Sequence, residues 1–259
     1  MVEASLTEAS LTRERHNCHT GNSWWLVQGV MKRALGQLLE ASIPRARAVG
    51  GQAGLRAPKN THPLLKPIVL ADEDTLLVGT VHWPPNAPHV TLATQTPAAI
   101  DDERYSLRPL GAPHEYAQRL LAEADAAARP LERRVAEAAH DLAKDANVEP
   151  YRPGSYAASK LSLPQFLLLK VGSFVDVWEE LALGRLARGE HTAALVAAER
   201  CAARHYGWAV GSCLQGRVLR QLNRREEERD VMVAALECPF WTLSSGTSLA
   251  SAQASAQLG

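Results

Sequence analysis

The feature of this sequence that most restricts its fold is a self-similarity within residues 174–239. Two segments with helical patterning superpose when one is shifted along the chain by 34 residues. The shift aligns Ala182 with Gly216, Gly189 with Asn223, Ala198 with Met232, and Cys201 with Ala235. A fixed period of this length is typical of architectures in which short units stack, because one unit alone cannot bury its apolar face. The period predicts architecture far better than it predicts chemistry.

Each unit is predicted to be two helices joined by a tight turn. Trp178, Leu181 and Ala182 recur at spacings of three and four residues, so they share one helix face. Gly189 is expected to end the first helix, because glycine adopts the left-handed conformation without strain. Asn223, the next-best residue for that conformation, takes the same place in the second unit. We therefore assign structural roles to Trp178, Leu181, Gly189, Gly216 and Asn223.

The pattern W-x-x-L-A…G…A-x-x-x-A-x-x-C, followed by G…L-N-R-R-E-E…M-x-x-A-L-x-x-P, resembles the tetratricopeptide-repeat (TPR) family. It comprises two degenerate repeats around 175–240, within a TPR-like region at 160–243. Arg185, Gln215 and Glu228 depart from the family, which has an aromatic residue, a leucine and a small alanine there. The resemblance implies a scaffold or assembly factor that binds another protein and is not an enzyme. Plant and algal plastids use many such proteins to assemble photosynthetic complexes. A helical domain that only looks repetitive is the alternative.

The resemblance also implies a binding groove formed by the first helix of each repeat. The groove positions carried onto this sequence are Asp176, Glu179, Leu183, Leu186, Val210, Cys213, Arg217 and Arg220. Arg217 and Arg220 are three residues apart, so both guanidinium groups are expected to face one ligand. Paired arginines suit the carboxylates of an acidic segment. The alternative is that acidic residues of the neighbouring helix neutralise them internally.

The rest of the ordered chain is predicted to combine a small sheet with further helices, giving a mainly α fold. Short β-branched runs at 67–70, 75–83 and 89–96 are separated by ADED and PPNAP, which indicates a β-meander or hairpin within 64–110. Residues 113–148 are alanine-rich and predict a helical hairpin or one kinked helix, broken near Ala128 because Pro130 cannot lie inside a helix. Ser162 is a candidate N-cap for a helix at 161–171.

Both ends of the chain lack a sustained core pattern. Residues 1–63 are expected to be flexible, and their basic amphipathic stretch from Trp24 resembles an organelle transit peptide. That reading predicts a chloroplast or another organelle as the location. Three early glutamates (Glu3, Glu8 and Glu14) argue against it, and a disordered tail on a cytoplasmic protein is an equal alternative. Residues 244–259 are predicted to be a low-complexity tail.

Composition narrows the classes of function. Lys+Arg and Asp+Glu number 28 each, so we expect no nucleic-acid partner. No apolar run approaches the roughly 18 residues of a membrane span, which leaves peripheral membrane association open. The HNCH motif at 16–19 has no second ligand pair, and no P-loop, GxGxxG, GxSxG or HExxH motif occurs. We therefore expect no catalytic residue, metal or cofactor. The alternative is a small enzyme or ligand-binding domain on the 66–96 sheet, with a pocket lined by His82, Trp83 and His89.

Overall fold

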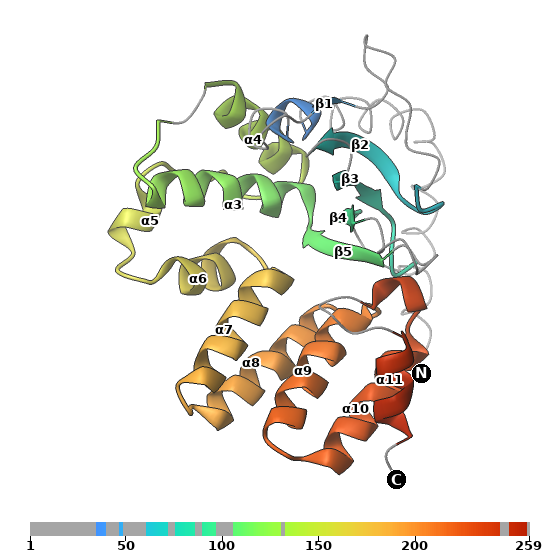
Figure 1. Ribbon diagram of the computed structural model, residues 1–259. Coiled ribbons are helices and arrows are strands. Elements are labelled where there is room, and N and C mark those ends of the chain that lie inside the picture. The colour runs from blue at the N-terminus through green and yellow to red at the C-terminus, as the bar shows by residue number, and fades with distance from the viewer. Residues whose placement is uncertain are drawn as a thin grey trace, which may run out of the picture.

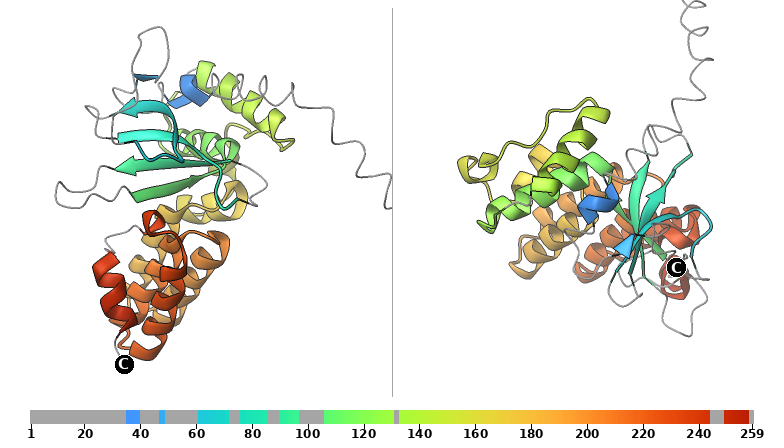
Figure 2. Two further views of the ribbon diagram at one scale, coloured as in Figure 1. Left: turned by 90° about the vertical axis from the view of Figure 1, so that its right-hand side faces the viewer. Right: turned by 90° about the horizontal axis from the view of Figure 1, so that it is seen from above.

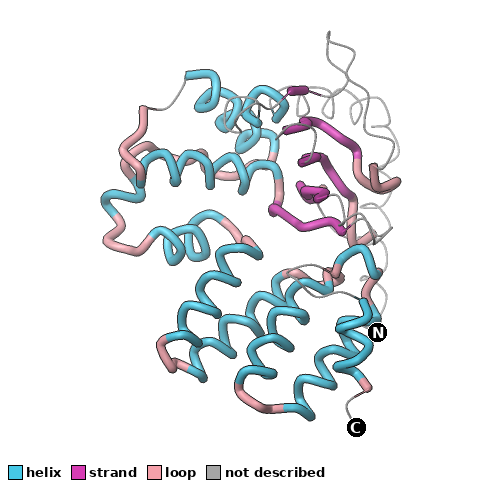
Figure 3. The backbone as a smooth tube through the Cα atoms, in the orientation of Figure 1, coloured by secondary structure: helices cyan, strands magenta, loops and turns pink. Residues whose placement is uncertain are grey.

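The computed structural model describes residues 35–39, 47–48, 61–71, 76–85, 90–96, 106–130, 133–243 and 249–257, and the statements below concern those residues. They form a mainly helical protein with a small antiparallel sheet that precedes most of the helices, so the predicted fold class is confirmed. The sheet and its flanking helices form one layer, and a stack of helical hairpins forms a second layer beneath it (Figures 1 and 3). None of the described helices has the length and apolarity needed to cross a bilayer.

The sheet is a meander whose strands are ordered as they occur in the chain. It consists of β1 (Arg47–Ala48), β2 (Lys66–Ala71), β3 (Leu76–Val81), β4 (Thr91–Thr96) and β5 (Ser106–Gly111). Every neighbouring pair is antiparallel. In β3, Gly79 lies where β2 approaches so closely that a Cβ atom would be 2.5 Å from the Lys66 carbonyl oxygen. β5 forms the edge of the sheet that faces the helical stack (Figures 1 and 2).

Helices α3 (Pro113–Ala126) and α4 (Arg133–Asp145) cover one face of the sheet (Figure 2). Their apolar residues pack against Val69, Val78 and Leu92, which are fully buried. Helix α3 ends just before Ala128, which has a positive φ of 49°. The helix therefore ends close to Pro130, as expected for a proline that cannot continue a helix.

Part of the N-terminal segment belongs to this layer, so the predicted boundary of a flexible region at residue 63 is wrong. Residues 35–39 are helical, and Leu35, Leu38 and Leu39 are completely buried in the core beneath the sheet. β1 pairs with β2. The sequence indicated an amphipathic stretch here, but it did not reveal that the apolar face of this stretch packs in the core.

The second layer begins with α5 (Ser155–Ala158), α6 (Leu163–Phe166) and a π-helical turn η1 (Leu167–Val171). The stack follows as α7 (Val175–Ala187), α8 (His191–Arg204), α9 (Ala209–Gln221) and α10 (Arg225–Glu237). It ends with η2 (Phe240–Thr242) and α11 (Leu249–Ala256). Helices α7 and α9 begin 34 residues apart, and so do α8 and α10.

The two hairpins also share one turn. The amide of Glu190 donates to the Arg185 carbonyl at 3.0 Å, and the amide of Arg224 donates to the Leu219 carbonyl at the same distance. These six-to-one bonds are those of a Schellman motif. Gly189 (φ 76°) and Asn223 (φ 58°) hold its left-handed position, as predicted. Residues 175–237 are thus two copies of one helix–turn–helix unit.

Small residues let the stacked helices approach closely. A Cβ atom on Gly211 of α9 would lie 2.5 Å from the Cα of Ala202 on α8. A Cβ atom on Gly216 would lie 2.6 Å from the Met232 sulfur on α10. Ala182, the counterpart of Gly216 in the first unit, is completely buried. The small-residue positions of the sequence pattern therefore mark helix–helix contacts.

The predicted low-complexity tail at 244–259 is also wrong for residues 249–257. Helix α11 packs beside α10, and Ala252 is fully buried with Met232, Ala235 and Leu243. Low complexity here reflects a helix built of alanine and serine. An alanine-rich face can pack closely against another helix although its composition resembles that of a linker.

Aromatic residues join the two layers. The ring of Trp241 in η2 contacts the rings of Trp83, Trp208 and His62, with centroid distances of 5.2, 5.8 and 4.9 Å. The indole N–H of Trp83 donates to the Gly207 carbonyl at 2.8 Å. The edge-on contacts of Trp83 and Trp208 with Trp241 stabilise an interface beyond the area they bury.

Candidate partner-binding site

The face of α7 and α9 that was predicted to bind a partner lies next to β5 and α3. Side chains of β5 and α3 bond some of its residues. Asp176 accepts two hydrogen bonds from Arg119 of α3, at 2.8 and 2.5 Å. Arg119 also bonds Glu123 at 2.7 Å and lies over the Phe174 ring. Burial would raise the pKa of Asp176, but the hydrogen bonds and charge of Arg119 hold that pKa below its usual value. Asp176 therefore anchors the sheet layer to α7.

Glu179 lies one turn further along α7 and joins three elements. One carboxylate oxygen accepts a bond from Arg108 of β5 at 2.9 Å, and the other accepts a bond from Arg217 of α9 at 3.0 Å. Glu179 is 18% exposed, whereas Arg108 and Arg217 are 36% and 43% exposed. Arg108 was not among the predicted site residues, because nothing near it in the sequence reveals that β5 faces α7.

Arg220, which was predicted to face one ligand together with Arg217, makes its hydrogen bonds to α10 and α11 instead. Its Nε donates to Glu228 of α10 at 2.7 Å, and its Nη2 donates to Ser255 of α11 at 2.5 Å. Glu228 is completely buried and also accepts a bond from Arg225. Arg220 therefore holds α9, α10 and α11 together. The acid of the neighbouring helix neutralises it internally, which was the alternative interpretation.

The apolar groove positions divide into two groups. Leu183 and Leu186 are half-buried and pack against the core of the stack. Val210 and Cys213 are fully buried, so they cannot contact a partner. The surface of this face that remains accessible therefore centres on Arg108, Glu179, Leu183 and Arg217.

Trp178 and His205 lie beneath that surface. The indole N–H of Trp178 donates to the Ser173 hydroxyl at 2.9 Å, and the same hydroxyl lies 3.2 Å from a ring nitrogen of His205. Burial lowers the pKa of His205 to about 4, and the Asp176 charge offsets only part of that effect. His205 is therefore neutral near pH 7 and serves the packing of α7 against α8.

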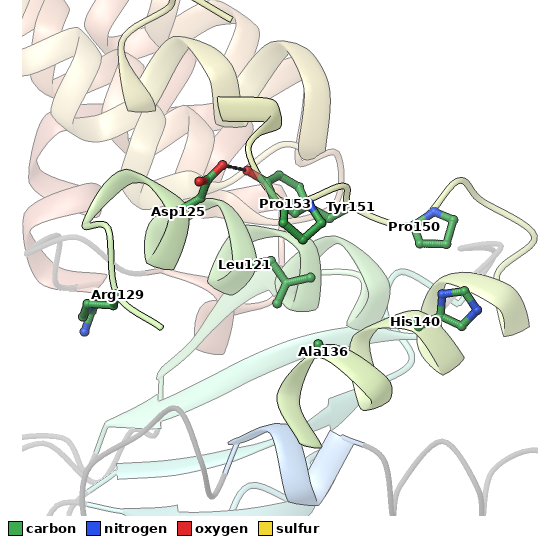
Figure 4. Close-up of a pocket in the computed structure, with 8 residues that line it drawn as sticks. All are labelled: Leu121, Asp125, Arg129, Ala136, His140, Pro150, Tyr151 and Pro153. Carbon is green, nitrogen blue, oxygen red and sulfur yellow. Dashed lines mark hydrogen bonds between the residues drawn. The ribbon is translucent and has the colours of Figure 1, made fainter. Parts of the chain in front are cut away.

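A cavity of about 370 Å³ lies between α3, α4 and residues 150–153 (Figure 4). Leu121, Ala136, Pro150 and Pro153 make its lining largely apolar. The polar groups do not converge on a ligand: the Tyr151 hydroxyl donates to Asp125 at 2.7 Å, while Arg129 and His140 lie at opposite ends (Figure 4). The cavity therefore indicates no ligand class.

The residues proposed for an enzyme built on the sheet do not form a site in the described part of the chain. His82 is exposed, and Trp83 is bonded to Gly207 and packed against Trp241. His89 and the HNCH motif lie outside the described residues. Among the described residues, no group of three or more His, Cys, Asp or Glu side chains could hold a metal ion.

Comparison with known proteins points to the same helical region. Residues 175–259, from the first residue of α7 onward, match the PAB middle domain family. The chain is also similar to Protein IN CHLOROPLAST ATPASE BIOGENESIS, chloroplastic, of Arabidopsis thaliana, with 31% identity over 133 residues. That alignment covers 50% of this chain and 38% of the Arabidopsis protein, so the chain matches well under half of its relative. No solved structure matches the chain.

Proposed function

We propose that this protein is a non-enzymatic assembly factor that binds another protein through helices α7–α10 and supports the biogenesis of the plastid ATPase. The observation that carries this proposal is the similarity to a protein named for chloroplast ATPase biogenesis, together with the PAB middle domain match over 175–259. Both agree with a helical domain of the scaffold type.

The repeated hairpins support the protein-binding part of the proposal. Helices α7 and α9 present adjacent faces, as the first helices of TPR-like repeats would, and we assign the two hairpins to a TPR-like class. Glu179, Leu183 and Arg217 lie on the accessible part of that face. Charged and apolar groups side by side are typical of protein interfaces that must remain soluble when unbound.

A plastid location requires a targeting segment, which we place at the N-terminus. Leu35, Leu38 and Leu39 are buried in the core, so cleavage at residue 63 would remove part of the folded protein. We therefore propose that a transit peptide ends before Leu35. Residues 1–34 fused to a fluorescent protein should enter plastids of algal or plant cells, and a diffuse cytosolic signal would reject the targeting segment.

The assembly role can be tested by deleting the gene in its plastid-bearing host and measuring assembled ATPase on native gels. The ATPase should decrease while its subunits are still synthesised, because an assembly factor acts after translation. A tagged copy should restore the complex and co-purify with at least one ATPase subunit. Normal ATPase levels in the deletion strain would refute the proposed function.

A further inference from the structure

Arg108, Glu179 and Arg217 form a cluster of two arginines around one glutamate. Each guanidinium makes one hydrogen bond to the single carboxylate between them, at 2.9 and 3.0 Å. The three side chains come from β5, α7 and α9, so the fold, rather than one flexible segment, sets their positions.

Most of the hydrogen-bonding capacity of the two arginines is unused. A guanidinium carries five N–H donors, and Arg108 and Arg217 each use one in the described structure. Both side chains are more than a third exposed. Their remaining donors can therefore reach solvent or a bound carboxylate.

A second cluster with two arginines shows what distinguishes this one. Glu228 also bonds two arginines, but it is completely buried, and the other arm of Arg220 is taken by Ser255 of α11. That cluster closes on itself and holds helices together. The Glu179 cluster opens onto the α7–α9 face, with half-buried Leu183 one helical turn away.

We propose that Arg108 and Arg217 bind an acidic segment of the partner protein, with Glu179 holding the two guanidinium groups in place. Arginine suits this role because its planar fork pairs with carboxylates in fixed geometry. Two exposed guanidinium groups with unused donors match one or two carboxylates. The cluster is too small for a polyanion such as a nucleic acid, which needs an extended basic surface, and the whole chain has no net charge. Leu183 would contact an apolar residue next to the acid. The inference rests on the proposed function for the partner being a protein.

The test uses the full chain and two fluorescein-labelled peptides, one of alternating glutamate and leucine and one with glutamine in place of each glutamate. Fluorescence anisotropy should show that the glutamate peptide binds at least about tenfold more tightly, as expected when charge-assisted bonds are lost. Arg108→Gln and Arg217→Gln should each weaken its binding by about tenfold. Glu179→Gln should also weaken it, because the two guanidinium groups lose the carboxylate that holds them in place.

Arg188→Gln is the matched control, because Arg188 is an exposed arginine that bonds Glu190 at the α7–α8 turn, away from this cluster. It should leave peptide binding unchanged. Arg108→Lys and Arg217→Lys keep the charge but lose the fork, and they should bind more weakly than the wild type. If a glutamine variant does not fold, the lysine variant still tests the same arginine. Equal binding of both peptides, no binding of the glutamate peptide, or unchanged binding by the Arg108 and Arg217 variants would overturn the inference.

The two proposals can fail separately. Lost peptide selectivity with reduced ATPase in the deletion strain would reject the acidic-segment site and keep the assembly role. Selective peptide binding with normal ATPase in the deletion strain would keep the site and reject that role.

Discussion

Trp178 should be the residue of the repeat stack whose truncation costs the most stability. Its side chain is 8% exposed and lies in the core formed by α7, α8, α9 and the sheet. Burying an aromatic side chain of roughly 200 Å² at about 25 cal/mol per Å² stabilises the fold by about 5 kcal/mol. That figure is an upper value, because the unfolded chain already buries part of this area. We therefore expect Trp178→Ala to lower the free energy of unfolding by about 3–5 kcal/mol, which is the range for large-to-small core changes.

Trp178→Phe separates packing from hydrogen bonding. Phenylalanine keeps most of the ring contacts but cannot donate to the Ser173 hydroxyl. Because a net hydrogen bond contributes about 1 kcal/mol, and some volume is also lost, this variant should lose only about 1–2 kcal/mol.

Urea unfolding followed by far-ultraviolet circular dichroism measures both changes without relying on tryptophan fluorescence. The m-value should stay constant if only the native state is affected. A loss below about 1 kcal/mol for Trp178→Ala would mean that the core does not depend on this ring, and the packing argument would be refuted.

Three further changes test other parts of the stack. Gly211→Ala should destabilise the protein by about 1–3 kcal/mol, because its Cβ would collide with the α8 backbone. Gly184→Ala should instead stabilise it by up to about 1 kcal/mol through helix propensity, because its Cβ meets only a side-chain nitrogen at 3.5 Å. Equal melting curves of the two variants would contradict this. Glu228→Gln should lower the free energy of unfolding by about 2–3 kcal/mol, which is less than the loss of a fully buried ion pair, because its two arginine partners are about half exposed. Amide hydrogen exchange should become faster at residues 249–257. Unchanged exchange there would show that α11 packs without this cluster. The free energy of unfolding should fall by about 3 kcal/mol in total as the pH decreases from 6.5 to about 4, because His205 is protonated at a higher pH in the unfolded chain than in the folded one. His205→Gln should remove that part of the pH dependence. An identical pH slope in the variant would exclude His205 as its source.

The parts of the fold that follow from local physics could be predicted from the sequence. The turns at Gly189 and Asn223 depend on one residue type at one backbone position, and the break beside Pro130 depends on a missing N–H and a steric clash. Strands β2, β3 and β4 followed from β-branched runs separated by turn residues, whereas β1 and β5 were not predicted. Each signal lies within a few residues of the structure it specifies.

The parts that depend on tertiary contacts could not be predicted. Arg220 was placed beside Arg217 because they are three residues apart, yet a helix turns by about 300° over three residues, and long side chains can follow different neighbours. Arg217 turns toward α7, whereas Arg220 turns toward α10. A signal for the second contact was present: Glu228 stood where the repeat pattern has a small alanine, three residues after a pair of arginines. A buried acid needs such partners, so this departure from the pattern marked an internal ion cluster.

The sheet layer changes how the repeat stack can act. Arg119 covers the start of α7 by pairing with Asp176, and Arg108 reaches Glu179 one turn later. Arg119 and Arg108 therefore cover part of the face of the first repeat. Both lie outside the region that matches the PAB middle domain, which begins at Val175. An isolated fragment from residue 175 onward would lose Arg119 from Asp176 and Arg108 from Glu179, while Glu179 would keep its bond to Arg217. Two positive charges would thus be removed from this face. If an acidic segment is the ligand, such a fragment should bind it worse than the full chain does, because the sheet supplies both the missing cation and the partner that neutralises Asp176.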